Sequence, residues 1–254
     1  MMNMYVLILM FSSLLFSSET IGLVIKHKGD VNYFPYDKNK SSKKINISES
    51  LFNQDLIRTG KDGFTKFVYL DDGSAIKIHK DSEVYVQGNI DKRKIIKQIN
   101  ISTGKLKLDI ENQQLSEFKI ITPTSVASIK GTRFWVDVNG KRGDTFHGLS
   151  GVVEITNNIT GKKIELIENT TAKSLPDGTL EIKKTINREL IKLEVLEEEV
   201  GEPVNDMPNN DSDDDSGSLI EENINYGTSN TNEIIIQLKN SSSDGKKLII
   251  KFTD

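Results

Sequence analysis

Apolar and polar residues alternate with a period of two over much of the middle of the chain, as expected for half-buried β-strands. The stretch FTKFVYLDDGSAIKIHKDSEVYVQG holds two such runs around an Asp-Gly pair at 72–73. This dipeptide between alternating runs is a strong hairpin signal. We expect Val68 and Leu70 to share one buried face with Ile76 and Ile78, and the meander to continue through residues 84–86.

The same pattern of turn residues and alternating strands recurs further along the chain. A Thr-Gly pair at 103–104 predicts a turn, after which Leu106, Leu108 and Ile110 alternate with polar residues. GVVEITN, KKIELIEN and PDGTLEIKK repeat the pattern. Short strands between turn residues predict a mainly β fold, an antiparallel sandwich or roll, because βαβ units would need helical patterns between the strands.

Residues 122–138, TPTSVASIKGTRFWVDV, combine a proline turn, an apolar run and a second alternating run. Phe134, Val136 and Val138 are expected to face the core. Gly131 is read as a position where a β-carbon would collide with a neighbouring strand, or where φ is positive.

Trp135 is the only tryptophan and lies opposite that core face. One interpretation places it under another part of the chain. The other makes it an exposed aromatic anchor for a partner, flanked by Lys130 and Arg133.

The period changes to three and four between 185 and 200, which predicts a short amphipathic helix ending at Gly201. The apolar positions of that helix are Ile186, Leu190, Leu193, Leu196 and Val200. Glutamates at 197–199 stand at its C-terminal end, where the helix dipole disfavours negative charge, so we expect this end to fray.

The patterns divide the chain into five segments. Residues 1–18 carry no charge and include an apolar stretch over 5–16, which predicts a signal peptide; a buried helix and an uncleaved anchor are the alternatives. A β-domain over 19–184 and the helix over 185–200 follow. Residues 201–232 are acidic and polar and predict a disordered linker. Residues 233–254 predict a terminal β-hairpin.

Charge is distributed unevenly. Residues 19–193 carry 29 Lys and Arg against 22 Asp and Glu, whereas residues 194–232 carry 12 acidic residues and no basic one. The acidic segment either folds over the basic body or meets a different partner. We expect no nucleic-acid partner, because no recognised binding motif or basic helix is present.

Candidate chemistry is sparse. Without cysteine, the chain has no disulfide and no thiolate metal site, and its three histidines form no metal-binding spacing. No nucleophile stands at a readable spacing from a base, and no phosphate-binding loop occurs. We therefore expect neither enzymatic activity, nor a cofactor, nor a metal.

Residues 23 to about 182 resemble the FecR domain, a periplasmic β-rich module. The resemblance rests on a Gly-Asp-Val opening at 29–31, the segment DLIRTGKDGFTKFVYLDDGSAIKI, a glycine at 104 and the strand LSGVVEI. It also rests on Thr-Pro and Gly-Thr-x-Phe-x-Val elements. The motif positions, expected to be mainly structural, are Asp55, Thr59, Gly60, Asp72, Gly73, Thr122, Pro123, Gly131, Thr132, Phe134 and Val136.

The resemblance implies a binding role in the cell envelope. Regulatory members carry a cytoplasmic anti-sigma segment and a membrane-spanning helix, whereas only four residues precede the apolar run here, so that arm is not expected. Arg133 also stands where an acidic residue is common in the family.

Three interpretations of the function follow. The first is an exported, non-enzymatic module that binds a protein partner in the envelope or periplasm. The second is a peptidoglycan-binding module. The third is the extracytoplasmic sensor of a split sigma/anti-sigma system. Membrane contact is expected only through an uncleaved N-terminal segment.

Overall fold

A computed structural model describes residues 19–37, 39, 41–92, 94–113 and 117–202, together with three strands beyond residue 224. The chain divides into a body, up to Met207, and a C-terminal unit that begins at Pro208. The signal peptide expected over 1–18 and most of the linker expected over 201–232 lie outside the described residues.

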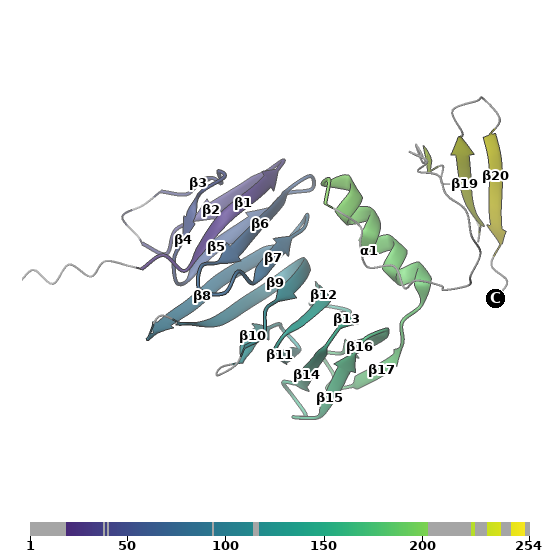
Figure 1. The fold of residues 1–254 in the computed structure, drawn as a ribbon. Coiled ribbons are helices and arrows are strands. Elements are labelled where there is room, and N and C mark those ends of the chain that lie inside the picture. Colours follow the sequence, from purple (N-terminus) through teal and green to yellow (C-terminus); the bar gives the residue numbers. More distant parts are fainter. Residues whose placement is uncertain are drawn as a thin grey trace, which may run out of the picture. The chain divides into compact units, whose positions relative to one another are not determined.

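The body is mainly β, as the alternation predicts, and its strands form two sheets that share one long strand (Figure 1). We call the sheets A and B. Sheet A runs, in spatial order, through β4 (Ser50–Leu51), β1 (Gly22–Lys28), β6 (Phe64–Tyr69), β7 (Ala75–Ile78), β9 (Lys94–Ile110), β12 (Thr132–Asn139), β13 (Gly143–Ser150), β16 (Thr170–Ser174) and β17 (Leu180–Lys184).

Sheet B is built in the same way on the other side of the core. Its order is β3 (Lys43–Lys44), β2 (Val31–Phe34), β5 (Asp55–Thr59), β8 (Glu83–Asp91), β9, β10 (Phe118–Ile121), β11 (Ser125–Ile129), β14 (Val152–Asn157) and β15 (Lys163–Ile167). Neighbouring strands are antiparallel, except that β9 and β10 run parallel. From β10 onward, successive hairpins alternate between the two sheets, which extends both sheets together.

Strand β9 passes from sheet B into sheet A at Gly104, and the turn predicted at 103–104 is wrong. Thr103 pairs with Glu83 in sheet B, and Gly104 pairs with Val138 in sheet A. Gly104 has a φ of +107°, and a β-carbon there would lie 2.0 Å from the Ser82 hydroxyl oxygen. A glycine therefore lets one strand bend between two sheets without interrupting it.

Substitution of Gly104 tests this bend. We expect Gly104→Ala to lower the free energy of unfolding by about 2–3 kcal/mol, because alanine adopts this φ poorly and its methyl group meets Ser82. Gly140→Ala is the matched control, since a β-carbon there meets nothing within 4 Å. Urea unfolding of both variants measures the difference, and equal stabilities would contradict the account.

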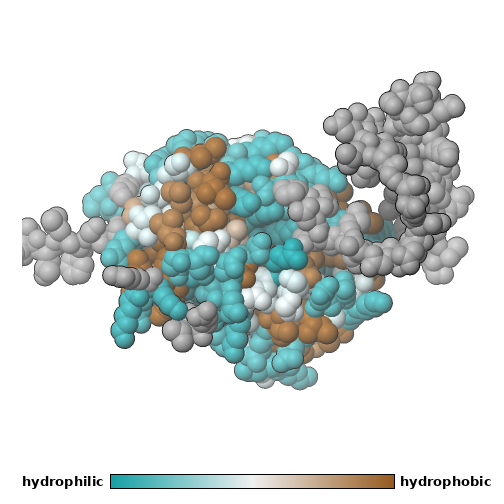
Figure 2. Space-filling model, in the orientation of Figure 1, coloured by the Kyte–Doolittle hydropathy of each residue, from teal (hydrophilic) through white to brown (hydrophobic). Residues whose placement is uncertain are grey.

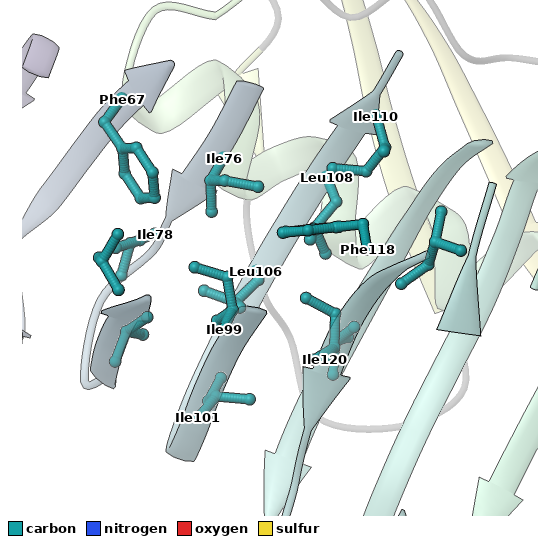
Figure 3. Close-up of a cluster of buried hydrophobic side chains, with 14 of the residues drawn as sticks. Phe67, Ile76, Ile78, Ile99, Ile101, Leu106, Leu108, Ile110, Phe118 and Ile120 are labelled. Carbon is teal, nitrogen blue, oxygen red and sulfur yellow. The ribbon is translucent and has the colours of Figure 1, made fainter. Parts of the chain in front are cut away.

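The core lies between the sheets and contains the side chains expected from residues 106–110, which Figure 3 shows, and those expected from residues 134–138. The face predicted for β6 is wrong by one residue. Phe67 and Tyr69 face the core and are fully buried, whereas Val68 is half-buried and Leu70 is 52% exposed. Phe67 pairs with Ile76, so the two aromatic rings fill the space that the smaller residues were expected to fill.

A single α-helix is described, α1 (Asn187–Glu199), within the predicted range. It follows β17 and lies along the outer face of sheet A (Figure 1). Leu190 and Leu193 are buried, and Ile186 is exposed. No helix among the described residues is long and apolar enough to cross a membrane.

The C-terminal unit contains three antiparallel strands: β18 (Asn225–Tyr226), β19 (Glu233–Lys239) and β20 (Gly245–Lys251). β19 pairs with β20 over its whole length, with Ile236 opposite Leu248. The pairing of β18 with β19 reaches into the segment expected to be disordered.

Candidate functional site

Asp55, the first of the motif residues, is buried at the start of β5 and organises the loops beside it. Its carboxylate accepts hydrogen bonds from the Tyr33 hydroxyl at 2.5 Å and from the backbone amides of Tyr36 at 2.9 Å and Phe52 at 2.7 Å. Burial and this contact raise the pKa of Tyr33, which keeps its hydroxyl a donor. The Asp55 carboxylate therefore stabilises the fold of the domain.

The Asp-Gly turn at 72–73 is tied to β9 by a buried lysine. Lys97 is 2% exposed, and its ammonium lies 2.8 Å from Asp71 and 2.9 Å from Asp72. Burial by itself raises the pKa of Asp72, but hydrogen bonds from Lys97, Gln113 and the Ser74 amide outweigh burial and hold that pKa below its usual value. The two carboxylates are thus occupied by structural contacts.

Other motif residues also fix turns. The Thr59 hydroxyl donates to the His79 carbonyl at 2.6 Å and accepts from the Ser82 amide at 2.9 Å. The Thr122 hydroxyl accepts from the Ser125 amide at 3.0 Å, so it closes the turn at Pro123 between β10 and β11.

The corner at Gly131 opens into a cleft of about 640 Å³ between the ends of the two sheets. A β-carbon on Gly131 would lie 3.0 Å from the Asn112 α-carbon, so the close approach expected at this glycine is present. Lys130 is exposed, and Arg133 Nε donates to the Ser150 hydroxyl at 3.3 Å. Both basic side chains line the cleft, as do five acidic ones: Asp109, Glu111, Glu117, Glu154 and Glu165.

Trp135 does not join this cleft, and its interpretation as an exposed anchor is wrong. The side chain is 2% exposed and lies on the outer face of sheet A, opposite the core face of β12. The His79 ring lies 4.8 Å from it between centroids, and the Lys107 ammonium lies 5.7 Å from its ring centroid. Both neighbours contact Glu197 of α1, so another part of the chain covers this tryptophan.

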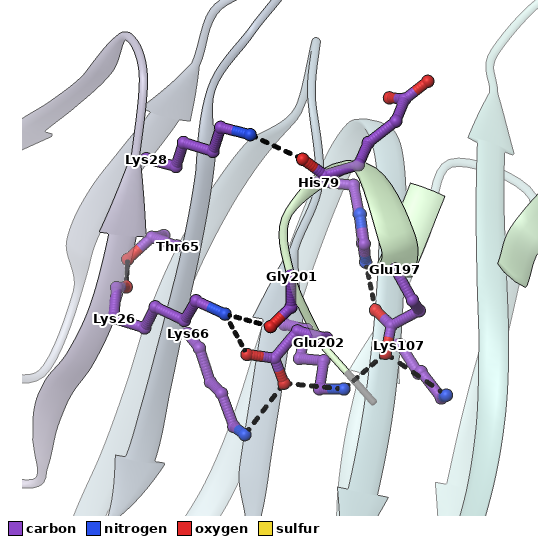
Figure 4. A network of polar contacts seen from close by, with 11 residues as sticks. Lys26, Lys28, Thr65, Lys66, His79, Lys107, Glu197, Gly201 and Glu202 are labelled. Carbon is purple, nitrogen blue, oxygen red and sulfur yellow. Dashed lines mark hydrogen bonds and ion pairs between the residues drawn. The ribbon is translucent and has the colours of Figure 1, made fainter. Parts of the chain in front are cut away.

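The C-terminal end of α1 is held in place by ion pairs, so the predicted fraying is wrong (Figure 4). Glu197 is fully buried; it pairs with Lys77, lies 2.9 Å from His79 Nε2 and lies 3.3 Å from Lys107. The lysines of the sheet compensate the charge that opposes the helix dipole.

Glu202, just beyond the helix, extends this cluster. Its carboxylate lies 2.8 Å from Lys26, 3.1 Å from Lys66 and 3.0 Å from Lys77. Glu202 and the end of α1 therefore fold over the basic body. Most of the acidic segment 194–232 lies outside the described residues, so for that part both interpretations stay predictions.

Sequence reasoning missed this cluster. A signal existed: Lys66, Lys77 and Lys107 each occupy an outward position of an alternating strand, and glutamates at a helix C-terminus require compensation. Their pairing depends on which strands become neighbours, and alternation alone does not determine that.

Residues 55–154 match the model of the FecR protein family. The chain carries a FecR-like domain. The match begins at β5 and ends within β14, so it includes the motif residues and the Gly131 corner, while α1 lies outside it.

Two crystal structures from Parabacteroides distasonis ATCC 8503, of a protein provisionally named as an anti-sigma factor, are similar to this chain with TM-scores of 0.46 and 14% identity. The alignments cover 54% of this chain and 62–63% of those chains. No curated protein matches the sequence.

The FecR-like domain offers no metal site in its described part: no three His, Asp or Glu side chains gather there in a way that could hold an ion.

Acidification is expected to loosen the carboxylate cluster. Burial by itself raises the pKa of Glu197, but contacts with His79, Lys77 and Lys107 outweigh it and bring that pKa to about 2. Glu202 likewise has a pKa of about 2, because its three lysines outweigh burial. Both values lie below the ordinary 4.5, so the stability they contribute is present above pH 4.5 and is lost as the pH falls toward 2.

Histidine adds an earlier phase. Burial lowers the pKa of His79 despite the opposing effect of Glu197, and Lys77 and Lys107 lower it further. Burial also lowers the pKa of His147, where Glu189 and Asp137 oppose and Lys183 adds to the shift. Because both values lie below 6.5, the unfolded chain binds protons first and stability declines as the pH falls below 6.5.

We expect the free energy of unfolding to fall modestly between pH 7 and 5, and more steeply below pH 4.5. Urea unfolding followed by Trp135 fluorescence across this range measures both phases. A flat profile from pH 7 to 3 would contradict the assigned shifts.

Proposed function

We propose that the chain is an exported FecR-type module that binds a protein partner in the cell envelope and carries out no catalysis. The observation that carries the proposal is the cleft at Gly131. Two motif residues, Gly131 and Thr132, line it, and its other lining residues except Glu165 also belong to the matched segment 55–154. The motif carboxylates Asp55 and Asp72 are engaged in structural contacts, whereas the charged side chains that line the cleft stand around an opening that a partner can enter.

The lining of the cleft suits a protein surface. Five carboxylates and two basic side chains stand around an opening shared by both sheets. Val152, 49% exposed, adds an apolar group to the same wall. Such a mixture of charged and apolar groups is typical of a transient protein interface, in which charge fixes the register and apolar burial adds affinity. A complementary partner would present basic side chains to the glutamates and a carboxylate to Lys130, so reversing the charge of Lys130 would place two carboxylates against each other.

Peptidoglycan binding is the weaker candidate. The net positive charge of the body favoured an anionic polymer, but Lys26, Lys66, Lys77 and Lys107 are paired with glutamates of the chain itself. Sedimentation of the chain from Glu19 with purified sacculi at low and high salt distinguishes the two. Salt-sensitive pelleting would favour the polymer.

A sensor role is favoured by the family match, since FecR-type regulators respond outside the cytoplasm and act on other proteins. On this reading the protein bound at the cleft is a component of a signalling system. A regulated promoter whose output changes when the cleft is altered would support it.

The proposal is tested by a charge reversal in the cleft. Lys130→Glu changes an exposed side chain of the cleft, and Lys141→Glu makes the same change in the exposed turn between β12 and β13. Tagged chains are purified from cells crosslinked before lysis. We expect one envelope protein to be recovered with wild type and with Lys141→Glu, and roughly tenfold less with Lys130→Glu.

Equal recovery with the two variants would overturn the assignment of the cleft. Recovery of the chain from the cytoplasmic fraction would overturn the assignment of its location.

A further inference from the structure

The outer face of sheet A carries a second set of buried aromatic side chains, separate from the core between the sheets. Phe64 and Trp135 are both buried, yet neither belongs to that core. His79 joins them: its ring lies 5.2 Å from Phe64 and 4.8 Å from Trp135 between centroids. Together they form a continuous aromatic floor on a face that a sandwich would normally present to solvent.

Lysines surround this floor. Lys26, Lys66, Lys77 and Lys107 come from four adjacent strands, β1, β6, β7 and β9. All of them contact carboxylates of Glu197 or Glu202 (Figure 4). We call the aromatic floor and these lysines the sheet A groove. Its chemistry selects an apolar ligand that carries carboxylates at one end.

The helix that fills the groove is a poor helix by itself. Its N-terminus has no side-chain cap, and its last turn contains glutamates and no basic residue, against the helix dipole. Among its side chains only two leucines, Leu190 and Leu193, are buried apolar groups. An isolated helix of 13 residues is marginal in water. The order of α1 therefore depends on the groove. Because α1 packs on the outer face of sheet A, its release leaves the two sheets packed on each other.

The groove also extends beyond what α1 fills. Next to the end of the helix lies a cleft of about 290 Å³, lined by Lys28, Lys61, Lys80, His79 and Leu196, among others. On the face drawn in Figure 2, hydrophilic side chains cover most of the body and apolar groups form separate patches. A longer helix with more carboxylates would reach lysines that α1 contacts only through Glu199.

We propose that the sheet A groove is a binding site for an acidic amphipathic helix of a second protein, and that α1 with Glu202 occupies it in cis. The partner's helix would place leucine-like side chains over Trp135 and Phe64, and its carboxylates on the lysines. This is helix-in-groove recognition with an intramolecular competitor. The site is distinct from the Gly131 cleft and does not depend on what that cleft binds.

The groove is tested with a labelled synthetic peptide of residues 186–202 as the probe. The full chain with Leu190→Ala and Leu193→Ala loosens α1 and leaves the groove unchanged. Because apparent affinity scales with the fraction of chains whose groove is open, we expect the probe to bind this variant roughly tenfold more tightly than wild type. Trp135 reports the state directly: acrylamide should quench it more in the variant, and the probe should restore its protection.

A second probe with Glu197→Lys is the matched control and should not bind. If the double-leucine chain does not fold, the Glu197→Gln and Glu202→Gln chain serves in the same assay, since it loosens α1 through its ion pairs.

Three results would overturn the proposal. The first is that acrylamide reaches Trp135 in the variant chain but the probe does not bind. The second is that the Glu197→Lys peptide binds as tightly as the peptide with the natural sequence. The third is a variant chain that dimerises with Trp135 protected, because the occupant would then be the helix of a second copy.

Discussion

Replacing Glu197 by glutamine is expected to lower the free energy of unfolding by about 3 kcal/mol, because it removes a fully buried carboxylate that compensates the charges of buried Lys107 and half-buried Lys77. Glu197 is fully buried and lies against Lys77, Lys107 and His79. Glutamine keeps the shape of the side chain, so the loss reports charge and not packing. Lys77 keeps a contact with Glu202, which limits the effect.

Urea unfolding followed by the fluorescence of Trp135 measures this loss, since the ring lies beside two of the groups that contact Glu197. Glu198→Gln is the matched control: its side chain is exposed on the same turn of α1. The control should leave stability within about 0.5 kcal/mol of wild type. Similar losses in both variants would show that the ion pairs under α1 do not stabilise the fold.

The second large effect is expected at Asp55. Asp55→Ala removes an acceptor that serves the Tyr33 hydroxyl and the amides of Tyr36 and Phe52. Each donor left unsatisfied costs about 1–3 kcal/mol when it is buried, so a total loss of about 3 kcal/mol or more is expected. Chemical unfolding measures it.

Asp37→Ala is the control for that experiment. Asp37 also accepts a backbone hydrogen bond, from Asn39, but it is exposed. Its replacement should cost less than about 1 kcal/mol, because water can serve the amide. If Asp55→Ala were no more destabilising than Asp37→Ala, the Asp55 carboxylate would not stabilise the fold and would need another role.

The strands could be predicted from the sequence because alternation is a local property. Leu106, Leu108, Phe134 and Val136 face the core where the pattern places them. The face of β6 was predicted wrongly because FTKFVYL contains apolar residues at both parities, and the larger Phe67 and Tyr69 take the core positions. The alternating pattern does not take side-chain size into account, and here size decides which of the two faces of β6 points to the core.

Sites that depend on neighbouring strands could not be predicted. Lys26, Lys77 and Glu202 are far apart in sequence and meet only because β1, β6 and β7 are adjacent under the end of α1. Gly104 was expected in a turn, because sequence alone cannot distinguish a turn from a bend within one long strand. Lys130 and Arg133, by contrast, could be found, because a short motif holds them together at one corner.

The fold thus separates two tasks. The motif carboxylates Asp55, which is buried, and Asp72, which is half-buried, hold turns of the FecR-like domain, and the corner at Gly131 remains open between the sheets. Four lysines of sheet A are paired within the chain, Lys77 and Lys107 with Glu197 of α1 and Lys26 and Lys66 with Glu202. Disturbing one of these two faces should leave the other intact.

Site-specific photocrosslinking in living cells tests the central claim, that the Gly131 cleft receives an envelope protein. A photoreactive amino acid replaces Val152 in the wall of the cleft, or Ile159, which is exposed in the loop between β14 and β15. We predict one discrete crosslinked protein of the envelope from position 152 and none from position 159. Crosslinks from both positions, or from neither, would contradict the assignment.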